Sequence, residues 1–234
     1  MSDREYDRIP YVVQVEFRTA SSFLVAYSVN LSRGGIFVET DVEIPSGAAI
    51  SLDLQVPGAG LLHLIGAVAW RRTPESPDGP PGLGIEFQDV GPQLGSTIDK
   101  LVSLFHGVHI LVLSGDRQDR TTLARSIKSI ISTAEVLQAA DVEVAATLLT
   151  SEIDLAVVDL DFDTQGALKT LRAAQQLVPK VPTVALTASP KLRELARLAG
   201  ADEMASNPPP FAELQIVLVR ALSKPVSVRS TASG

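Results

Sequence analysis

The chain has no cysteine among its 234 residues, so it can form no disulfide and offers no thiolate to a metal. It also lacks any apolar run of about 18 residues, the length that a membrane-spanning helix would need. Basic residues are in the minority, with 20 Lys and Arg against 27 Asp and Glu and a net charge of −7. This acidic balance argues against general binding to nucleic acid or to an anionic membrane surface. The polar segment 1–8 does not resemble a secretory signal, and we therefore expect a soluble, cytoplasmic protein.

The composition of the chain is sufficient to build a folded hydrophobic core. Hydrophobic residues make up 45% of the sequence and charged residues 20%, and the mean hydropathy is +0.21. The length fits one large domain or two small ones. The pattern of the sequence changes near residue 107, which favours two. We expect one domain over residues 1–106, a second over 107–224, and a flexible polar tail over 225–234.

The first domain reads as short alternating runs separated by proline and glycine turns. In Ala49–Val56, apolar side chains alternate with polar ones, a period of two that is typical of a half-buried strand. A helix should follow, because Ser96 and Asp99 have the spacing of a capping box. The first domain is therefore predicted to be an all-β barrel of six strands with a C-terminal helix. The predicted strands are Tyr11–Phe17, Phe23–Val29, Gly35–Glu39, Ala49–Val56, Leu62–Arg71 and Leu83–Phe87.

The second domain alternates strands and helices with a period near 25 residues. The runs Val108–Leu113, Leu155–Leu160 and Pro182–Leu186 are rich in Val and Leu, as buried parallel strands are. Between them, apolar residues recur at the spacing of one helix face. This order predicts a doubly wound α/β sheet.

Two short motifs in the first domain carry binding chemistry. Arg4 and Arg8 place two guanidinium groups four residues apart, just before the first expected strand. Arginine offers a planar fork of donors for phosphate oxygens or for the acceptors of guanine. The segment from Asn30 through Ser32 to Gly35 could present polar groups to a base edge, and its glycines let a ligand approach closely. Taken singly, each motif is weak, since most such arginines are solvated and such segments are most often turns.

Taken in order, the two motifs resemble the PilZ family over roughly residues 3–106. The segments Arg8-Ile9-Pro10, Gly66–Trp70 and Gly82–Phe87 agree with that resemblance. It implies a six-stranded barrel that binds cyclic di-GMP, with the leader arginines over the dinucleotide and the second motif against guanine. The residues that it implies for the site are Arg4, Arg8, Asn30, Ser32 and Gly35, with Arg33 and Gly34 as helpers. Asp3, Glu5 and Asp7 interleave the arginines, and these carboxylates should lower the affinity for an anionic ligand.

The second half, roughly residues 108–222, resembles a response-regulator receiver domain. The resemblance puts Asp159 at the phosphoacceptor position and Thr187 at the switch position. The acidic metal-binding positions are occupied by Ser114 and Gly115, and Asn207 stands where the family has a lysine. Phosphoryl transfer needs Mg²⁺ and a balancing cation, so we interpret this half as a pseudo-receiver. An inward shift of Asp116 that supports weak phosphorylation of Asp159 is the alternative.

The sequence thus predicts a bacterial signalling adaptor that binds cyclic di-GMP and acts through contacts with a signalling or motility protein. No catalytic arrangement, metal site or resident cofactor is expected. A homodimer is left open. Two alternatives remain: a PilZ-like interaction module that needs no nucleotide, and a response regulator driven by phosphorylation of Asp159.

Overall fold

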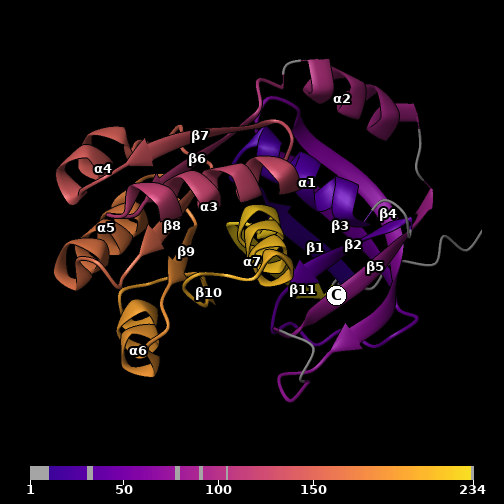
Figure 1. Cartoon of the computed structure of the whole chain (residues 1–234). Helices are drawn as coiled ribbons and strands as arrows, with labels where there is room; N and C mark the ends of the chain where they lie inside the picture. Colours follow the sequence, from indigo (N-terminus) through magenta and orange to yellow (C-terminus); the bar gives the residue numbers. More distant parts are fainter. Residues whose placement is uncertain (1–10, 31–33, 77–79, 90–91, 104, 233–234) are drawn as a thin grey trace, which may run out of the picture. The chain divides into compact units, whose positions relative to one another are not determined.

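A computed structural model of the chain describes residues 11–30, 34–76, 80–89, 92–103 and 105–232 (Figure 1). The chain divides into two compact units. Unit 1 comprises residues 1–105 and 224–234, and unit 2 comprises residues 106–223. The boundary thus falls between Phe105 and His106, and the end of the chain returns to unit 1. Every helix within the described residues is too short or too polar to cross a membrane.

Unit 1 is built on a six-stranded sheet with the order β11-β1-β3-β4-β5-β2. Neighbouring strands are antiparallel except for β1 and β3, which are parallel. The apolar alternation of the sequence becomes the inner face of this sheet, and Ile50, Leu52 and Leu54 are at most 1% exposed. The strands are β1 (Tyr11–Glu16), β2 (Gly35–Glu39), β3 (Ala49–Val56), β4 (Gly60–Arg72), β5 (Gly82–Asp89) and β11 (Ser227–Ala232).

Five of the six strands predicted for the first domain are present, and one is wrong. Phe23–Val29 lies inside helix α1 (Ala20–Asn30). Thr19 and Ser22 begin this helix with reciprocal bonds: the Ser22 amide donates to Thr19 Oγ1 at 3.0 Å, and the Thr19 amide donates to Ser22 Oγ at 3.1 Å. Phe23 and Ala26 enter the core beside the strands, and Phe23 stacks on Tyr27 one turn later at 5.9 Å. The run Phe23–Val29 suggested a strand because periodicity alone does not distinguish a short apolar run in a strand from one in a buried helix.

The sixth strand comes from the segment that was expected to be a flexible tail, and that prediction is wrong. β11 pairs antiparallel with all six residues of β1, from Tyr11 opposite Ala232 to Glu16 opposite Ser227. Val228 packs against the unit 1 core, and Lys224 Nζ donates to Glu39 Oε1 at 2.8 Å. β11 is polar in sequence because only part of it touches the core, while its backbone completes the ladder beside β1.

The predicted C-terminal helix of unit 1 is present as α2 (Pro92–Ser103). It begins four residues before Ser96, so Ser96 lies inside the helix and the capping-box prediction of its start is wrong. In this helix Leu101 is buried, whereas Val102 is 56% exposed.

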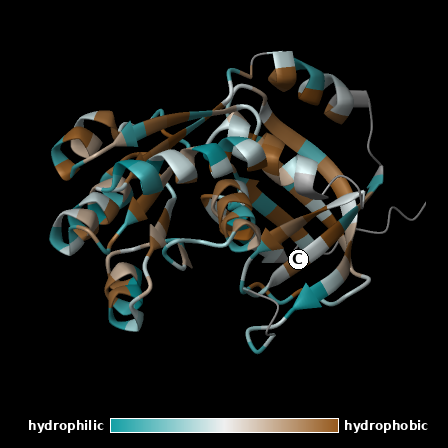
Figure 2. Ribbon diagram, viewed as in Figure 1, coloured by the Kyte–Doolittle hydropathy of each residue, from teal (hydrophilic) through white to brown (hydrophobic). Residues whose placement is uncertain are grey.

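Unit 2 is the predicted doubly wound α/β domain, with five parallel strands in the order β10-β9-β8-β6-β7. Helices α3 and α7 pack together on one face of the sheet, and α4, α5 and α6 form a neighbouring row on the other. Figure 2 shows the central strands as apolar, in keeping with a sheet that is covered on both faces. The elements are β6 (Val108–Leu113), α3 (Arg117–Ile130), β7 (Ala134–Ala139), α4 (Val142–Leu148), β8 (Leu155–Asp159), α5 (Thr164–Gln176), β9 (Thr183–Leu186), α6 (Pro190–Leu198), β10 (Glu203–Ala205) and α7 (Phe211–Ser223).

Candidate functional site

The second predicted binding motif ends where α1 passes into β2. Asn30 is the last residue of α1, not the end of a strand as the sequence suggested. Gly34 has a φ of +66°, a conformation that glycine adopts without strain, and its carbonyl oxygen accepts from the Phe87 amide at 2.9 Å. Gly35 opens β2 opposite Glu86, and a Cβ atom there would lie 2.1 Å from the Ile85 carbonyl oxygen. Only glycine therefore fits at the position where the motif meets β5.

Gly35 lies at a surface hollow of about 250 Å³ formed by β2, β4 and β5. Trp70, which is 38% exposed, and Phe37 stack across this surface with ring centroids 5.2 Å apart and an interplanar angle of 9°. The Arg72 guanidinium carbon is 4.6 Å from the Phe37 ring centroid, within the range of a cation–π contact. The hollow thus combines the motif glycine with an exposed aromatic surface.

The other residues of the predicted nucleotide site cannot be placed. Arg4, Arg8, Ser32 and the suggested helper Arg33 lie outside the described residues, and Asn30 is described only as the end of α1. Among the predicted site residues, Gly35 is thus the one whose surroundings are described. That these residues together bind a nucleotide remains a prediction.

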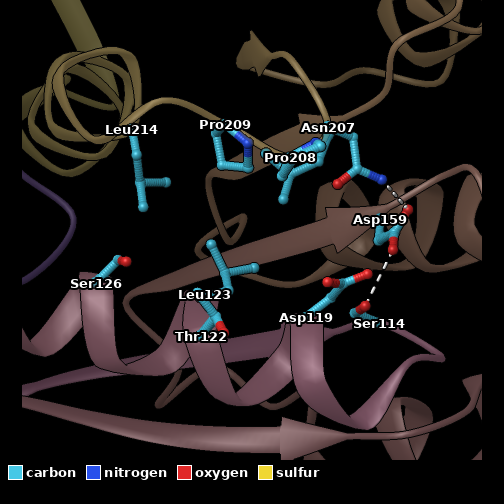
Figure 3. A pocket seen from close by; sticks show the side chains of 11 residues that line it. Ser114, Asp119, Thr122, Leu123, Ser126, Asp159, Asn207, Pro208, Pro209 and Leu214 are labelled. Carbon is cyan, nitrogen blue, oxygen red and sulfur yellow. Dashed lines mark hydrogen bonds between the residues drawn. The ribbon is translucent and has the colours of Figure 1, made fainter.

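The second candidate site lies at the carboxyl ends of the unit 2 strands (Figure 3). Asp159, the last residue of β8, is 7% exposed. Its Oδ2 accepts from Ser114 Oγ at 3.0 Å, and its Oδ1 accepts from the Asp161 amide at 2.9 Å and from Asn207 Nδ2 at 2.8 Å. The structure therefore brings together three of the positions that the receiver resemblance singles out: the acceptor aspartate, Ser114 and Asn207.

Burial is the main influence on the charge state of Asp159. Desolvation raises the pKa of this carboxyl above its ordinary value, and the nearby negative charges of Asp161 and Asp119 raise it further. The hydrogen bonds from the Asp161 amide and from Ser114 act in the opposite direction. Neither Asp159 nor Asp161 forms an ion pair with a lysine or arginine in the part of the chain that the structure describes.

The donor set does not fit the Mg²⁺ of a phosphorylatable receiver. Asp116, suggested as a displaced metal ligand, instead caps α3, with its Oδ1 accepting from the Gln118 amide at 2.7 Å and the Asp119 amide at 2.9 Å. Asp159 already accepts hydrogen bonds at both oxygens. Over residues 11–30, 34–76, 80–89, 92–103 and 105–232, no three acidic or histidine side chains converge as metal ligands. Neither metal binding nor phosphoryl transfer is supported by this geometry.

A small cavity of about 70 Å³ adjoins Asp159 (Figure 3). Asp119, Asp159 and Asn207 form its polar end, and Leu123 and Leu214 are among the apolar residues at its walls. This volume accommodates a few water molecules, far less than a nucleotide. The sequence interpretation missed Asp119 and the role of Asp161. The Asp-x-Asp spacing at the end of β8 was the available signal for Asp161.

Comparison with known proteins agrees with the two folds. Residues 2–104 match the family described as PilZ domain. Unit 2 has the strand order 2-1-3-4-5 of flavodoxin-like domains, the order that receiver domains also have. Residues 2–104 thus match the PilZ domain family, and unit 2 has a doubly wound α/β fold with the strand order that receiver domains share. No curated protein matches the chain.

Several solved structures resemble unit 2. The signal receiver domain of a DNA-binding response regulator from Colwellia psychrerythraea 34H is 16% identical, with 50% of this chain and 99% of that chain covered and a TM-score of 0.45. A response regulator from Thermotoga maritima is 20% identical, with 50% and 99% covered and a TM-score of 0.45. A chemotaxis response regulator from Vibrio cholerae is 18% identical, with 49% and 98% covered and a TM-score of 0.43.

Proposed function

We propose that this protein is a cytoplasmic signalling adaptor that binds cyclic di-GMP through its PilZ domain and relays the signal by protein contacts. The observation that carries the proposal is the ordered pair of motifs, Arg4 with Arg8 and then Asn30 to Gly35, inside the segment that matches the PilZ domain family. The hollow beside Gly35 supports it, because Trp70 offers an exposed aromatic surface next to the motif.

In this proposal each group has a separate task. The guanidinium groups of Arg4 and Arg8 grip the phosphates and the guanine acceptors of the ligand. Asn30 and Ser32 supply hydrogen bonds to a base, and Gly35 leaves room for the ligand beside the sheet. Neither unit performs a catalytic step. The output passes to a signalling or motility protein.

Calorimetric titration of the full chain with cyclic di-GMP tests the proposal. Binding should be saturable, and Arg8→Ala should weaken it at least about tenfold, since a charge-assisted hydrogen bond is lost. Arg125→Ala, which changes an exposed arginine of unit 2, should leave binding unchanged. Asp7→Ala should leave the affinity unchanged or raise it, because a competing carboxylate is removed.

Absence of heat with wild-type protein at micromolar concentration would favour the alternative of a nucleotide-independent interaction module. Equal losses in Arg8→Ala and Arg125→Ala would indicate nonspecific attraction of an anion rather than a site.

A further inference from the structure

The side-chain amide of Asn207 bridges two carboxylates at the carboxyl edge of the unit 2 sheet. Its Nδ2 atom donates to Asp159 Oδ1 at 2.8 Å and to Asp161 Oδ2 at 3.1 Å. An asparagine NH₂ group has two hydrogens, and these two bonds use both of them. Asn207 follows β10, whereas Asp159 ends β8, so the amide joins two strands that are not neighbours in the sheet.

The network continues from Asp161 to the end of β9. Thr187 Oγ1 donates to Asp161 Oδ1 at 2.5 Å, and the Ala188 amide donates to Asp161 Oδ2 at 3.2 Å. Thr187 is fully buried, and its hydroxyl oxygen also accepts from the Ser189 amide at 3.1 Å. The hydroxyl at the position of the receiver switch therefore has its hydrogen committed to Asp161.

We infer that Asn207 is a positioning residue that fixes the receiver-like unit in a single arrangement, without a metal ion or a phosphoryl group. This inference concerns unit 2 alone and does not depend on cyclic di-GMP binding by unit 1.

Charge and geometry both support this role. A lysine at this position would add a positive charge beside Asp159, whereas the asparagine amide adds hydrogen bonds and no charge. Arg120, on the adjacent helix α3, donates its Nη1 to the carbonyl oxygens of Ser114 at 2.7 Å and Gly115 at 3.2 Å. Its guanidinium thus holds backbone oxygens in place. An incoming phosphoryl group would meet carboxylates that are already hydrogen-bonded and that, among the described residues, are paired with no lysine or arginine.

The surface at the carboxyl edge of the unit 2 sheet is therefore determined when the chain folds, and phosphorylation is not needed to form it. The segments after β8, β9 and β10 are cross-linked through Asp161, Thr187 and Asn207, and Ser114 extends the network to β6. In a phosphorylation switch these groups change partners. Here they have partners in the unmodified chain, so unit 2 presents one fixed face to whatever binds there.

Hydrogen exchange of single amides on the full chain tests this role. Three backbone amides donate to side chains of the network and therefore report on it: Asp161, Ala188 and Ser189. Asn207→Ala should speed exchange at Asp161 and Ala188 by about tenfold or more, the effect of losing a hydrogen bond of ordinary strength. Amides of the central strand β8, such as that of Val157, should keep their rates.

Gln175→Ala is the matched control, because Gln175 is also an amide that joins separate segments of unit 2. Its Nε2 donates to the Gly200 carbonyl oxygen at 2.7 Å, outside the network. It should leave the three reporter amides unchanged. If Gln175→Ala speeds them as much as Asn207→Ala does, or if Asn207→Ala changes them less than twofold, the inference is wrong.

Thr187→Val gives a second test should Asn207→Ala fail to fold. Valine keeps the shape of threonine but cannot donate to Asp161 or accept from Ser189. Exchange should quicken at Ala188 and Ser189 while Asp161, which bonds to Asp159, keeps its rate. Equal acceleration at all three amides would contradict the arrangement.

Mg²⁺ with beryllium fluoride, a phosphoryl mimic, supplies the final test on wild-type protein. The fixed arrangement predicts unchanged exchange at Ala188 and Ser189 in its presence. A saturable change at these two amides would show that the switch is still operable and would overturn the inference.

Discussion

The indole ring of Trp70 lies directly over Gly84, its partner across the β4–β5 ladder. A Cβ atom on Gly84 would lie 2.2 Å from Trp70 Cε2, so the ring occupies the space that any side chain would need. Phe37 extends this contact from β2, where it pairs with Gly84 on the other side. One glycine thus lets two aromatic rings from flanking strands meet and stack, and this contact gives the hollow beside Gly35 its wall.

The contact predicts that Gly84→Ala destabilises unit 1 by about 1–3 kcal/mol, because the added methyl group displaces a packed ring. Denaturant unfolding of unit 1 would measure the loss. In the double variant with Trp70→Ala, the alanine at position 84 should cost much less, since its obstacle is gone. Additive losses would show that the ring does not occupy this position.

Trp70 is the only tryptophan in the chain, so its fluorescence reports on the hollow alone. Cyclic di-GMP should change the Trp70 emission with the same midpoint as the calorimetric titration. Arg8→Ala should shift that midpoint to higher ligand concentration in both measurements. Binding that leaves the emission unchanged would place the ligand away from the hollow while leaving the proposed nucleotide binding intact.

Asp159 should make the free energy of unfolding depend on pH. Burial raises the pKa of this acid in the folded protein, so the folded chain binds more protons than the unfolded chain between the two pKa values. The stability of unit 2 should therefore fall as the pH rises through this interval, and the cost of the buried charge is complete above the folded pKa.

Asp159→Asn should consequently be more stable than wild type at pH 8, and the difference should shrink as the pH falls from the raised folded pKa to the ordinary aspartate pKa. An asparagine oxygen can accept from Asn207 and Asp161, and its NH₂ group can donate to Ser114 Oγ, so the shape of the network survives. Thermal unfolding across pH measures this effect. Asp163→Asn, which alters the N-cap of α5, is a control that should show no gain at pH 8.

Removal of residues 225–234 should destabilise unit 1, since β1 would lose its partner on one side and Val228 its place against the core. We expect a loss of about 1–3 kcal/mol, the sum of a few net hydrogen bonds. Exchange at the β1 amides that face β11 should quicken, whereas the unfolding of unit 2 should not change. Val228→Ala, which keeps the backbone ladder, should cost less than the deletion.

The sequence predicts most of the fold where a pattern is long or contacts are local. β3 has the predicted bounds because eight alternating residues leave no ambiguity between a strand and a helix. Phe23–Val29 was misjudged because a short apolar run fits either a strand or a buried helix, and the deciding contacts are the cap at Thr19 and the Phe23–Tyr27 stack. β11 could not be found from its polar sequence, because its strand character arises from pairing with a segment more than 200 residues earlier.

The candidate sites follow the same division. The position of Asp159 at the end of a buried strand was evident from the apolar run before it. The hydrogen bonds from Asn207 to Asp159 and Asp161 were not evident from the sequence. Asn207 lies 48 positions after Asp159 and 46 after Asp161, and these residues meet only once the sheet has formed. The leader arginines remain a prediction from their spacing and from the motif that follows.

The pairing of β1 with β11 also affects how the protein is made. A ribosome delivers the chain from the N-terminus, so residues 1–105 emerge well before the strand that flanks β1. The sheet of unit 1 therefore has β1 as an unpaired border until all of unit 2 has been synthesised. A nascent chain stalled within unit 2 would expose that border to other strands, and chaperone dependence is expected to be greatest over this interval.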